Sequence, residues 1–276
     1  MAKAMRVMEE NLNLCDAVVC VLDARAPASS FNARLIKMAG NKPVLYVLNK
    51  GDLADGRADG LLSLMKKSGK NAVKIAANSA SSQRTLQAAM TEITEDKAAR
   101  LKERGSLKPI RFLIAGVPNT GKSTVINLLA GGKKAQVGDK AGVTRGKQWV
   151  RCGSFELMDT PGTMPPAIEN QTLARRLAYT GGINDDILAI DEIALCLLAE
   201  LAKNYPAALM ERYGIEEPAE PLEMLNKVCA RRGFVLKGND FDYERGERAV
   251  IDDLRKGKLG KVCFDSADDL KEVGLI

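Results

Sequence analysis

The sequence predicts an α/β fold with a mostly parallel sheet, followed by an all-helical C-terminal domain. Short apolar runs bounded by turn residues recur up to residue 159, and each has the length of a buried strand. Segments with apolar residues at helical spacing lie between these runs, an alternation typical of a parallel sheet covered by helices on both faces. Beyond this point helical spacing continues and strand-like runs almost disappear. Residues 1–170 and 171–276 are therefore expected to form two domains.

The elements of the first domain can be placed in order along the chain. Buried strands are expected at residues 18–23, 44–48, 73–77, 110–115 and 155–159. Helices are expected at residues 33–38, 61–67, 86–93 and 124–129. The charged, helix-prone segment 92–108 breaks at Gly105 and Ser106 and bridges the two halves of this domain. In the second domain, residues 185–205 carry apolar side chains at helical spacing, and the next strand-like run is at 262–264.

Composition and charge exclude several classes of protein. The chain has 276 residues, of which 46% are hydrophobic, enough to build two cores. Its 41 Lys and Arg against 35 Asp and Glu give a net charge of +6, a mild bias toward polyanions. Six cysteines without a C-x-x-C pair, and no histidine, argue for reduced thiols and against a zinc cluster. No signal segment is visible and no apolar run approaches the ~18 residues of a membrane span, so we expect a cytoplasmic protein outside membranes.

Residues 116–124, Gly-Val-Pro-Asn-Thr-Gly-Lys-Ser-Thr, have the pattern of a phosphate-binding loop between a strand and a helix. The glycines allow backbone N–H groups to turn toward phosphates, and the start of the next helix adds its positive dipole end. Lys122 is expected to neutralise the β and γ phosphates and Ser123 to ligate magnesium. The residues expected to contact the nucleotide in this loop are Asn119, Thr120, Gly121, Lys122, Ser123 and Thr124.

The phosphate loop does not separate ATP from GTP, so residues 49–52 decide the base. Asn49, Lys50, Gly51 and Asp52 follow the strand expected at 44–48. A carboxylate at Asp52 can accept two hydrogen bonds from the N1–H and 2-amino groups of guanine, a pair of donors that adenine lacks. These four residues are therefore expected to bind guanine.

A further loop, after the strand expected at 73–77, should place a backbone amide against the guanine oxygen. Two registers are open, residues 76–77 and residues 79–80. The first is favoured because it lies at the end of the strand, which makes Ala76 and Ala77 the expected contacts.

Residues 159–162, Asp-Thr-Pro-Gly, end the strand expected at 155–159 and have the pattern of a magnesium-sensing loop. Asp159 is expected to hold magnesium through water, and the Gly162 N–H to meet the γ-phosphate. Thr144 lies between the two phosphate-contacting loops and is expected to complete the magnesium shell. Ser123, Thr144 and Asp159 are thus the expected metal residues, and Lys122 and Thr144 the expected catalytic ones.

These motifs occur in an unusual order, because in ordinary small GTPases the phosphate loop comes first and the guanine reader near the end. This order, together with segments 15–27, 142–146 and 232–261, resembles the circularly permuted GTPases of the ribosome biogenesis GTPase A (YlqF) family. The resemblance implies a circularly permuted P-loop GTPase domain and a C-terminal helical domain. It also implies a factor that binds the large ribosomal subunit precursor late in assembly, with the second domain on ribosomal RNA, and leaves when GTP is hydrolysed to GDP.

The sequence departs from this family in two respects that bear on catalysis. It contains no histidine, although a histidine in a leader before the first residues has been proposed to activate water in the family. Thr163 stands where many GTPases have a water-orienting glutamine. Slow hydrolysis is therefore expected, with stimulation by ribosomal particles. The resemblance also implies stimulation by potassium, since Asn119 matches the asparagine that holds a monovalent ion in potassium-stimulated GTPases.

Two alternatives remain open: a nucleotide-sensing, RNA-binding scaffold with little hydrolysis, and a permuted GTPase that acts on another ribosomal particle. In either case a monomer is expected. RNA contact is expected within residues 226–261, where Arg255, Lys256 and Lys258 bring three positive charges close together.

Overall fold

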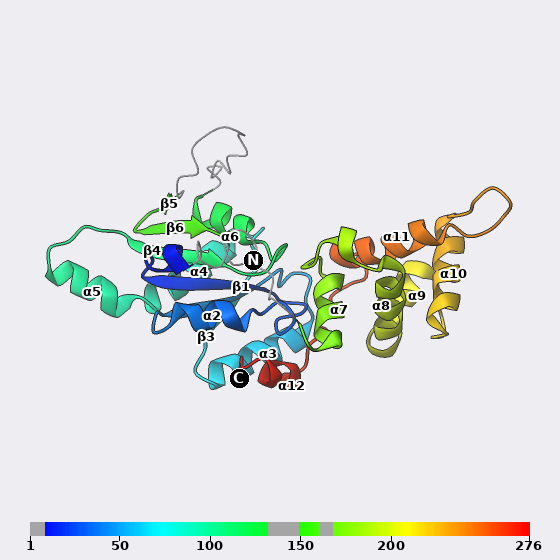
Figure 1. The fold of residues 1–276 in the computed structure, drawn as a ribbon, viewed down its shortest axis with the longest axis horizontal. Coiled ribbons are helices and arrows are strands. Elements are labelled where there is room, and N and C mark those ends of the chain that lie inside the picture. The colour runs from blue at the N-terminus through cyan, green and yellow to red at the C-terminus, as the bar shows by residue number, and fades with distance from the viewer. Residues whose placement is uncertain (1–8, 132–148, 161–167) are drawn as a thin grey trace. The chain divides into compact units, whose positions relative to one another are not determined.

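A computed structural model describes residues 9–131, 149–160 and 168–276. The chain divides into two compact units (Figure 1). The first, called here the sheet unit, comprises Met1–Ala167 and Asp265–Ile276, and the second, the helical unit, comprises Ile168–Phe264. The first break lies near the expected boundary at residue 170. The last 12 residues differ from the expectation, because they pack with the sheet unit and not with the helical one.

The sheet has six strands in the order β3-β2-β1-β4-β6-β5. Four neighbouring pairs, from β3 to β6, are parallel, and only β5 runs antiparallel, against β6. The strands are β1 (Ala17–Asp23), β2 (Val44–Asn49), β3 (Asn71–Lys74), β4 (Ile110–Ala115), β5 (Trp149–Cys152) and β6 (Phe155–Asp159). The mostly parallel sheet predicted from the apolar runs is confirmed.

Helices cover both faces of this sheet. Successive side chains of β1 point to opposite faces, so Val19 and Val21 pack in one apolar cluster with residues of α4 and α6, whereas Val18 packs in another with α2. The helices of the sheet unit are α2 (Ala33–Ala39), α3 (Gly56–Lys67), α4 (Ala80–Glu92), α5 (Glu95–Glu103), α6 (Lys122–Leu129) and α12 (Ala267–Glu272). Because both faces are buried, the strands read as continuous apolar runs.

Two strands differ from the sequence-based expectation. β3 ends at Lys74, three residues before the expected end, because the amides of Ala76 and Ala77 bond to side chains and not to a neighbouring strand. β5 was not expected. It is a short edge strand with only Cys152 buried, so it lacks the apolar run by which the others are recognised.

The C-terminal segment is fastened to the sheet unit by a buried carboxylate. Asp265 accepts hydrogen bonds from the Ser29 N–H at 2.9 Å and the Ser29 hydroxyl at 2.8 Å, and both residues are buried. Helix α12 follows directly and contacts α3. These contacts explain why residues 265–276 leave the helical unit, although they follow it in the sequence.

The helical unit is built around α8, which contacts four other helices. Its elements are α7 (Gln171–Tyr179), the 3-10 turn η1 (Asp185–Ile187), α8 (Ile190–Asn204), α9 (Pro206–Tyr213), α10 (Pro221–Arg232) and α11 (Tyr243–Arg255). The strand-like run at 262–264 forms no strand. Val262 and Phe264 are buried in the helical core, and the Cys263 amide and carbonyl both bond the Tyr205 hydroxyl, at 2.6 and 2.8 Å.

Among the described residues, no single helix is both long and apolar enough to cross a membrane. Helices α8 and α9 reach that length and apolarity only together, and the chain bends by 114° between them.

Candidate nucleotide-binding site

The loops singled out in the sequence follow the carboxyl ends of neighbouring strands of the sheet unit. Residues 49–52 follow β2, residues 75–79 follow β3, residues 116–121 join β4 to α6, and residues 159–160 end β6. In a parallel sheet these ends share one edge, which is where ligands bind. The structure therefore brings together segments that are up to 111 residues apart in the chain.

Asn49 joins three of these loops with one buried side chain. Only 2% of its surface is exposed. Its Nδ2 donates to the Thr120 carbonyl of the phosphate loop at 2.9 Å, and its Oδ1 accepts from the Ala77 N–H at 3.1 Å. Gly121 must be glycine here, because it has a φ of +91° and a Cβ would collide with the Asn49 amide nitrogen. The base-reading and phosphate-binding loops thus form one connected structure.

The phosphate loop is tightly folded before it meets any ligand. A Cβ on Gly116 would collide with the Val21 carbonyl of β1, so this position also requires glycine. Lys122 is only 8% exposed, and its ammonium donates to the Val117 carbonyl at 3.0 Å. Burial lowers the pKa of Lys122, while Asp159 acts to raise it. Helix α6 begins at Lys122, so its free N–H groups and this ammonium can serve a phosphate group together.

Ser123 and Asp159 form a pair of oxygen ligands suited to a magnesium ion. The Ser123 hydroxyl donates to Asp159 Oδ2 at 3.3 Å, while Asp159 Oδ1 is buried without a hydrogen-bond partner among the described residues. Burial raises the pKa of Asp159, although Lys122 and Ser123 act to lower it. A hard cation would give this orphaned oxygen a partner, and hydroxyl and carboxylate oxygens are the ligands Mg²⁺ prefers. The donor set therefore fits the ion. Thr144 and Gly162 lie outside the described residues.

The loop at residues 49–52 is held by the segment after β3 and leaves Asp52 exposed. The Gly51 N–H donates to the Ile75 carbonyl at 2.8 Å, and a Cβ there would press on the Lys74 side chain. Asp52 Oδ2 accepts one hydrogen bond, from Asn78 Nδ2 at 3.2 Å. Its carboxylate is therefore close to residues 75–79, called here the fifth loop, and still open to a ligand from solvent.

The two amides expected to contact guanine are both used inside the protein. The Ala76 N–H donates to the Ser82 hydroxyl at 3.1 Å and the Ala77 N–H to Asn49. In the competing register, the Ser79 N–H donates to the Ala76 carbonyl at 2.8 Å. Among the described residues the Asn78 N–H has no partner, and this amide belongs to neither of the two expected registers. Sequence alone did not reveal which amides the turn would consume.

A buried charge network beside the guanine reader was not recognised in the sequence. The Arg25 guanidinium binds Asp23 through Nε at 3.0 Å and Nη2 at 2.8 Å, and both residues are about 1% exposed. Lys50 Nζ lies 2.9 Å from Asp23 and donates to the Asn119 carbonyl at 2.6 Å. Burial acts to raise the pKa of Asp23, but Arg25 and Lys50 lower it to about 2. The signal was present, since the buried strand β1 ends in Asp23 and is followed by Ala24 and Arg25.

Strained backbone marks the place where Lys50 and Asn119 meet. Both have a φ of 59°, a left-handed conformation that is uncommon outside glycine. The buried Asp23 fixes the Lys50 ammonium against the phosphate loop, and this contact holds the two strained turns together. The Asn119 side chain itself is on an exposed residue.

The basic turn after α11, where RNA contact is expected, takes part in ion pairs. Arg255 forms a bidentate ion pair with Asp185, at 2.7 Å to each oxygen, and donates to two main-chain carbonyls at the end of α7. Lys256 and Lys258 each pair with an aspartate of α11, at 2.7 and 3.5 Å. These three cations therefore contribute to ion pairs within the helical unit.

Comparisons with known proteins identify relatives of this chain. A family model described as a 50S ribosome-binding GTPase matches residues 111–227. Ribosome biogenesis GTPase A of Bacillus cereus is 39% identical over 99% of this chain and 93% of its own length. The protein of that name from Priestia megaterium is 37% identical over 99% of this chain and 96% of its own. A crystal structure of GNP-bound YlqF from T. maritima matches with a TM-score of 0.66 at 28% identity, covering 95% of this chain and 97% of that one.

The sequence resemblance, the fold class and the expectation of a GTPase are thereby confirmed. An identity of 39% over nearly the whole of both chains indicates membership of the same family and not only a shared fold. This chain belongs to the ribosome biogenesis GTPase A family.

Proposed function

We propose that this protein is a GTP-hydrolysing assembly factor that binds the large ribosomal subunit precursor late in maturation and is released on hydrolysis. The observation that carries the proposal is Asn49, which bonds both the phosphate loop and the fifth loop at 2.9 and 3.1 Å and so builds one nucleotide site from three distant segments. The names of the relatives supply the ribosomal context. The protein acts as a monomer in the cytoplasm.

Guanine is selected by Asp52, whose carboxylate accepts from the N1–H and 2-amino groups of the base. The backbone N–H of Asn78, and not that of Ala76 or Ala77, is the donor to the guanine oxygen. It is supported by the hydrogen bonds that already occupy both alanine amides and by the 3.2 Å contact between Asn78 and Asp52. Lys50 and Gly51 hold the loop from which Asp52 projects.

The phosphates are bound by the amides of Thr120, Gly121 and Thr124 and by Lys122, which exchanges the Val117 carbonyl for phosphate oxygens. Magnesium is held by Ser123 and, through water, by Asp159, and when bound it neutralises charge developing between the β and γ phosphates. Thr144 completes the metal shell and Gly162 meets the γ-phosphate in this proposal. Burial of Lys122 supports its role, because a charge removed from water acts more strongly on a phosphate.

A potassium ion beside Asn119 is proposed to stimulate hydrolysis. The left-handed turn at this residue and its carbonyl contact with Lys50 keep the side chain at the surface of the phosphate loop. Single-turnover hydrolysis in potassium and in sodium tests this. Faster hydrolysis in potassium, lost in Asn119→Ala but not in the exposed control Asn71→Ala, is expected. Equal rates in the two salts would contradict the proposal.

Ribosomal RNA is proposed to contact exposed cations of α10, of the loop that follows it and of the first turn of α11. Their guanidinium and ammonium groups form no ion pair among the described residues, and Arg245 stacks on Phe234 at 4.5 Å. Exposed apolar side chains at positions 235 and 236 interleave with them. The proposed contacts are Lys227, Arg231, Lys237 and Arg245. Replacing all four by Gln should weaken binding of large-subunit particles and leave GTP affinity unchanged.

The assignment as a whole is tested by sedimentation and by GTP turnover with large-subunit precursor particles. Co-sedimentation with GTP, release with GDP and a hydrolysis rate raised by the particles are expected. Particles from the small subunit serve as the control. Tight binding that ignores the nucleotide, with no stimulation, would favour the scaffold alternative. Stimulation by small-subunit particles only would move the target to another ribosomal particle.

A further inference from the structure

Helix α5 (Glu95–Glu103) is poorly explained by the packing of the sheet unit. None of its nine residues is buried, and its N-cap residue makes no side-chain capping bond. A helix shorter than about 12 residues is marginal in water unless packing stabilises it. A helix that is polar on nearly all sides bridges domains through solvent, is held by many i,i+4 pairs, or is not stable by itself.

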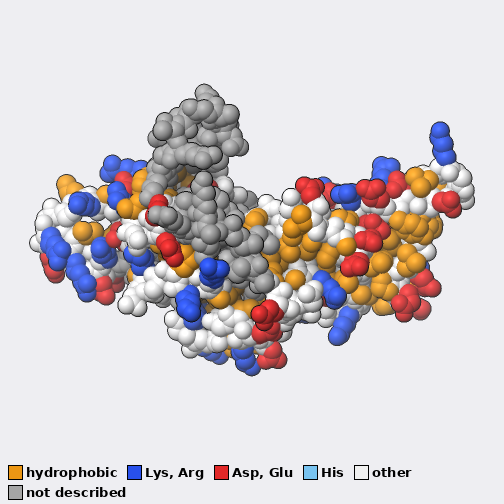
Figure 2. Space-filling model, in the orientation of Figure 1, with side chains coloured by type: hydrophobic (Ala, Val, Ile, Leu, Met, Phe, Trp, Pro, Cys, Tyr) orange, Lys and Arg blue, Asp and Glu red, His pale blue; other side chains and the backbone are white. Residues whose placement is uncertain are grey.

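Positive charge is concentrated in this helix and the linker after it. Residues 97–111 hold six Lys or Arg and one Glu, a net charge of +5 in a chain whose total is +6. Lys97 pairs with Asp16 and Arg111 with Glu156. The remaining cations of this stretch, all exposed and with no ion pair among the described residues, are Arg100, Lys102, Arg104 and Lys108. Figure 2 shows Lys and Arg side chains gathered over the end of the sheet unit formed by α5.

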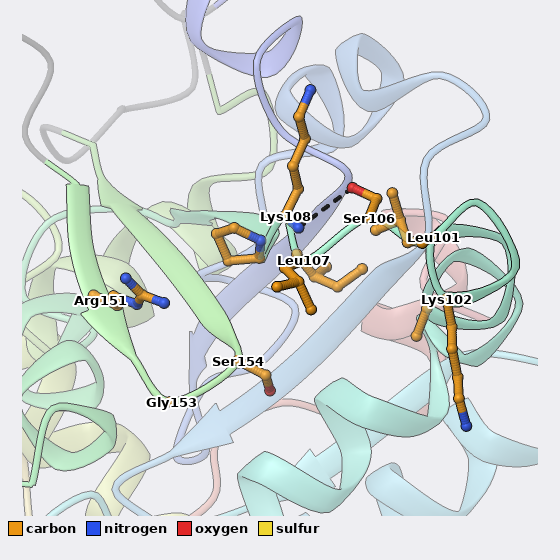
Figure 3. A pocket seen from close by; sticks show the side chains of 12 residues that line it. Leu101, Lys102, Ser106, Leu107, Lys108, Arg151, Gly153 and Ser154 are labelled. Carbon is orange, nitrogen blue, oxygen red and sulfur yellow. Dashed lines mark hydrogen bonds between the residues drawn. The ribbon is translucent and has the colours of Figure 1, made fainter.

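An open hollow of about 310 Å³ lies beside these charges, between α5, the linker and the turn joining β5 to β6 (Figure 3). Leu107 lies in its middle and is 98% exposed, an unusual state for a leucine next to a cavity. Arg151 on β5 and Lys102 on α5 lie on opposite sides of the hollow. The hollow thus combines an aliphatic lining with a surrounding rim of cations, Lys102, Lys108 and Arg151.

We propose that Arg100, Lys102, Arg104, Leu107, Lys108 and Arg151, called here the α5 surface, bind RNA. The ammonium and guanidinium groups neutralise backbone phosphates, and Leu107 packs against an unstacked base at the hollow. Charge complementarity selects a polyanion, and the apolar hollow inside the cationic rim favours RNA with unpaired bases, which offers phosphates and base faces together.

This surface is separate from the nucleotide site and from the RNA face proposed on the helical unit. The linker enters β4 and the hairpin turn enters β6 at their amino ends, whereas the nucleotide loops follow their carboxyl ends. Six residues of β4 separate the two edges by roughly 20 Å at ~3.3 Å per residue. The inference rests on the proposed function only for the identity of the RNA, and variants here should leave GTP binding intact.

The test measures affinity for protein-free large-subunit ribosomal RNA over a range of salt concentrations, using the full chain with saturating GDP. The charge variant replaces Arg100, Lys102, Arg104 and Lys108 by Gln, and the apolar variant is Leu107→Ser. A matched control replaces Arg34, Lys37, Lys66 and Lys67, which are exposed on α2 and α3, by Gln and so removes the same charge. GDP affinity of each variant reports that it is folded.

The charge variant should flatten the slope of log affinity against log salt by about 0.7–0.9 per lost contact, thus by up to about 3.6 when all four contacts are lost. Leu107→Ser should lower affinity by a similar factor at every salt concentration without changing the slope, because an apolar contact releases no counterions. An equal effect of the control would reduce the α5 surface to general electrostatics and overturn the proposal. Unchanged RNA affinity in both α5 variants would overturn it too. If these variants lost binding to poly-glutamate while keeping RNA affinity, the proposal would be overturned in favour of an acidic protein as the partner. Because protein-free RNA is the probe, absence of particle-stimulated hydrolysis would count against the proposed function and not against this surface.

Discussion

Removing the Asn49 side chain should disable the nucleotide site more severely than removing any other amide of the loops. In Asn49→Ala the Thr120 carbonyl and the Ala77 N–H lose their partners, and both lie at buried residues. Leaving a buried donor or acceptor unsatisfied costs about 1–3 kcal/mol for each group. The two losses together predict about 2–6 kcal/mol.

This free energy is shared between nucleotide affinity and folding. At about 1.4 kcal/mol for each factor of ten, a loss of 3 kcal/mol in the bound state alone would weaken GDP binding roughly 100-fold or more. In nucleotide-free Asn49→Ala, water that reaches the Thr120 carbonyl and the Ala77 N–H would reduce the loss of folding stability. The loss would then appear mainly as weaker nucleotide binding. Calorimetric titration with GDP and urea unfolding without nucleotide measure the two parts, and their sum is the quantity predicted.

Two further variants make the reasoning specific. Asn49→Asp keeps an acceptor for the Ala77 N–H but places an oxygen against the Thr120 carbonyl, so it should lose affinity as well. Asn71→Ala removes an exposed asparagine from β3 and should change neither quantity by more than about 0.5 kcal/mol. If Asn49→Ala binds GDP and resists urea as the parent does, Asn49 does not join the loops and the assigned site is wrong.

Three other predictions concern single charges. Asp52→Asn should shift preference from guanine toward xanthine nucleotides, whose 2-oxo group accepts where guanine donates, and equal affinity of the parent for ATP and GTP in calorimetry would sink this. Lys122→Ala should cost about 2–5 kcal/mol, mainly in single-turnover hydrolysis, from a basal rate of about 10⁻⁴–10⁻² per second, and parental rates in the variant would show that the lysine does not face phosphate. Asp23 has its folded pKa lowered to about 2, so it stabilises the fold above its unfolded pKa of about 4, and this stability is lost as pH falls from about 4 to 2. Urea unfolding should show a loss of roughly 2 kcal/mol in that window, absent in Asp23→Asn.

The loops proposed to bind the nucleotide were predictable because each is a short motif of consecutive residues. The glycine spacing and Lys122-Ser123 of residues 116–124 follow from backbone requirements that hold within one turn. Strand β4 was predicted with the bounds it has, because it is buried on both faces and reads as one apolar run. The edge strand β5 carries no such run, and it was missed for that reason.

The interactions that the sequence did not reveal depend on which side chains meet in the folded protein. Asp23 is recognisable as functional only when Lys50 and Arg25 are seen to share its carboxylate. The pairing of Arg255 in the basic turn was not predicted, because its partner Asp185 contacts it only after the helices pack. A count of charges along the sequence has no information about which of them are paired.

The sequence by itself determined the α/β class, the order of the guanine-reading, phosphate and magnesium loops, and the family, since all of these depend on local pattern and on order along the chain. Tertiary structure alone decided which hydrogen bonds those loops consume, leaving the Asn78 amide and not those of Ala76 and Ala77 without a partner among the described residues. It also decided that residues 265–276 return to the sheet unit, through the contact of Asp265 with Ser29, 236 residues away. The physical reason is common to both: a hydrogen bond depends on positions in space, and residues distant in sequence reach those positions only when the sheet and helices have packed.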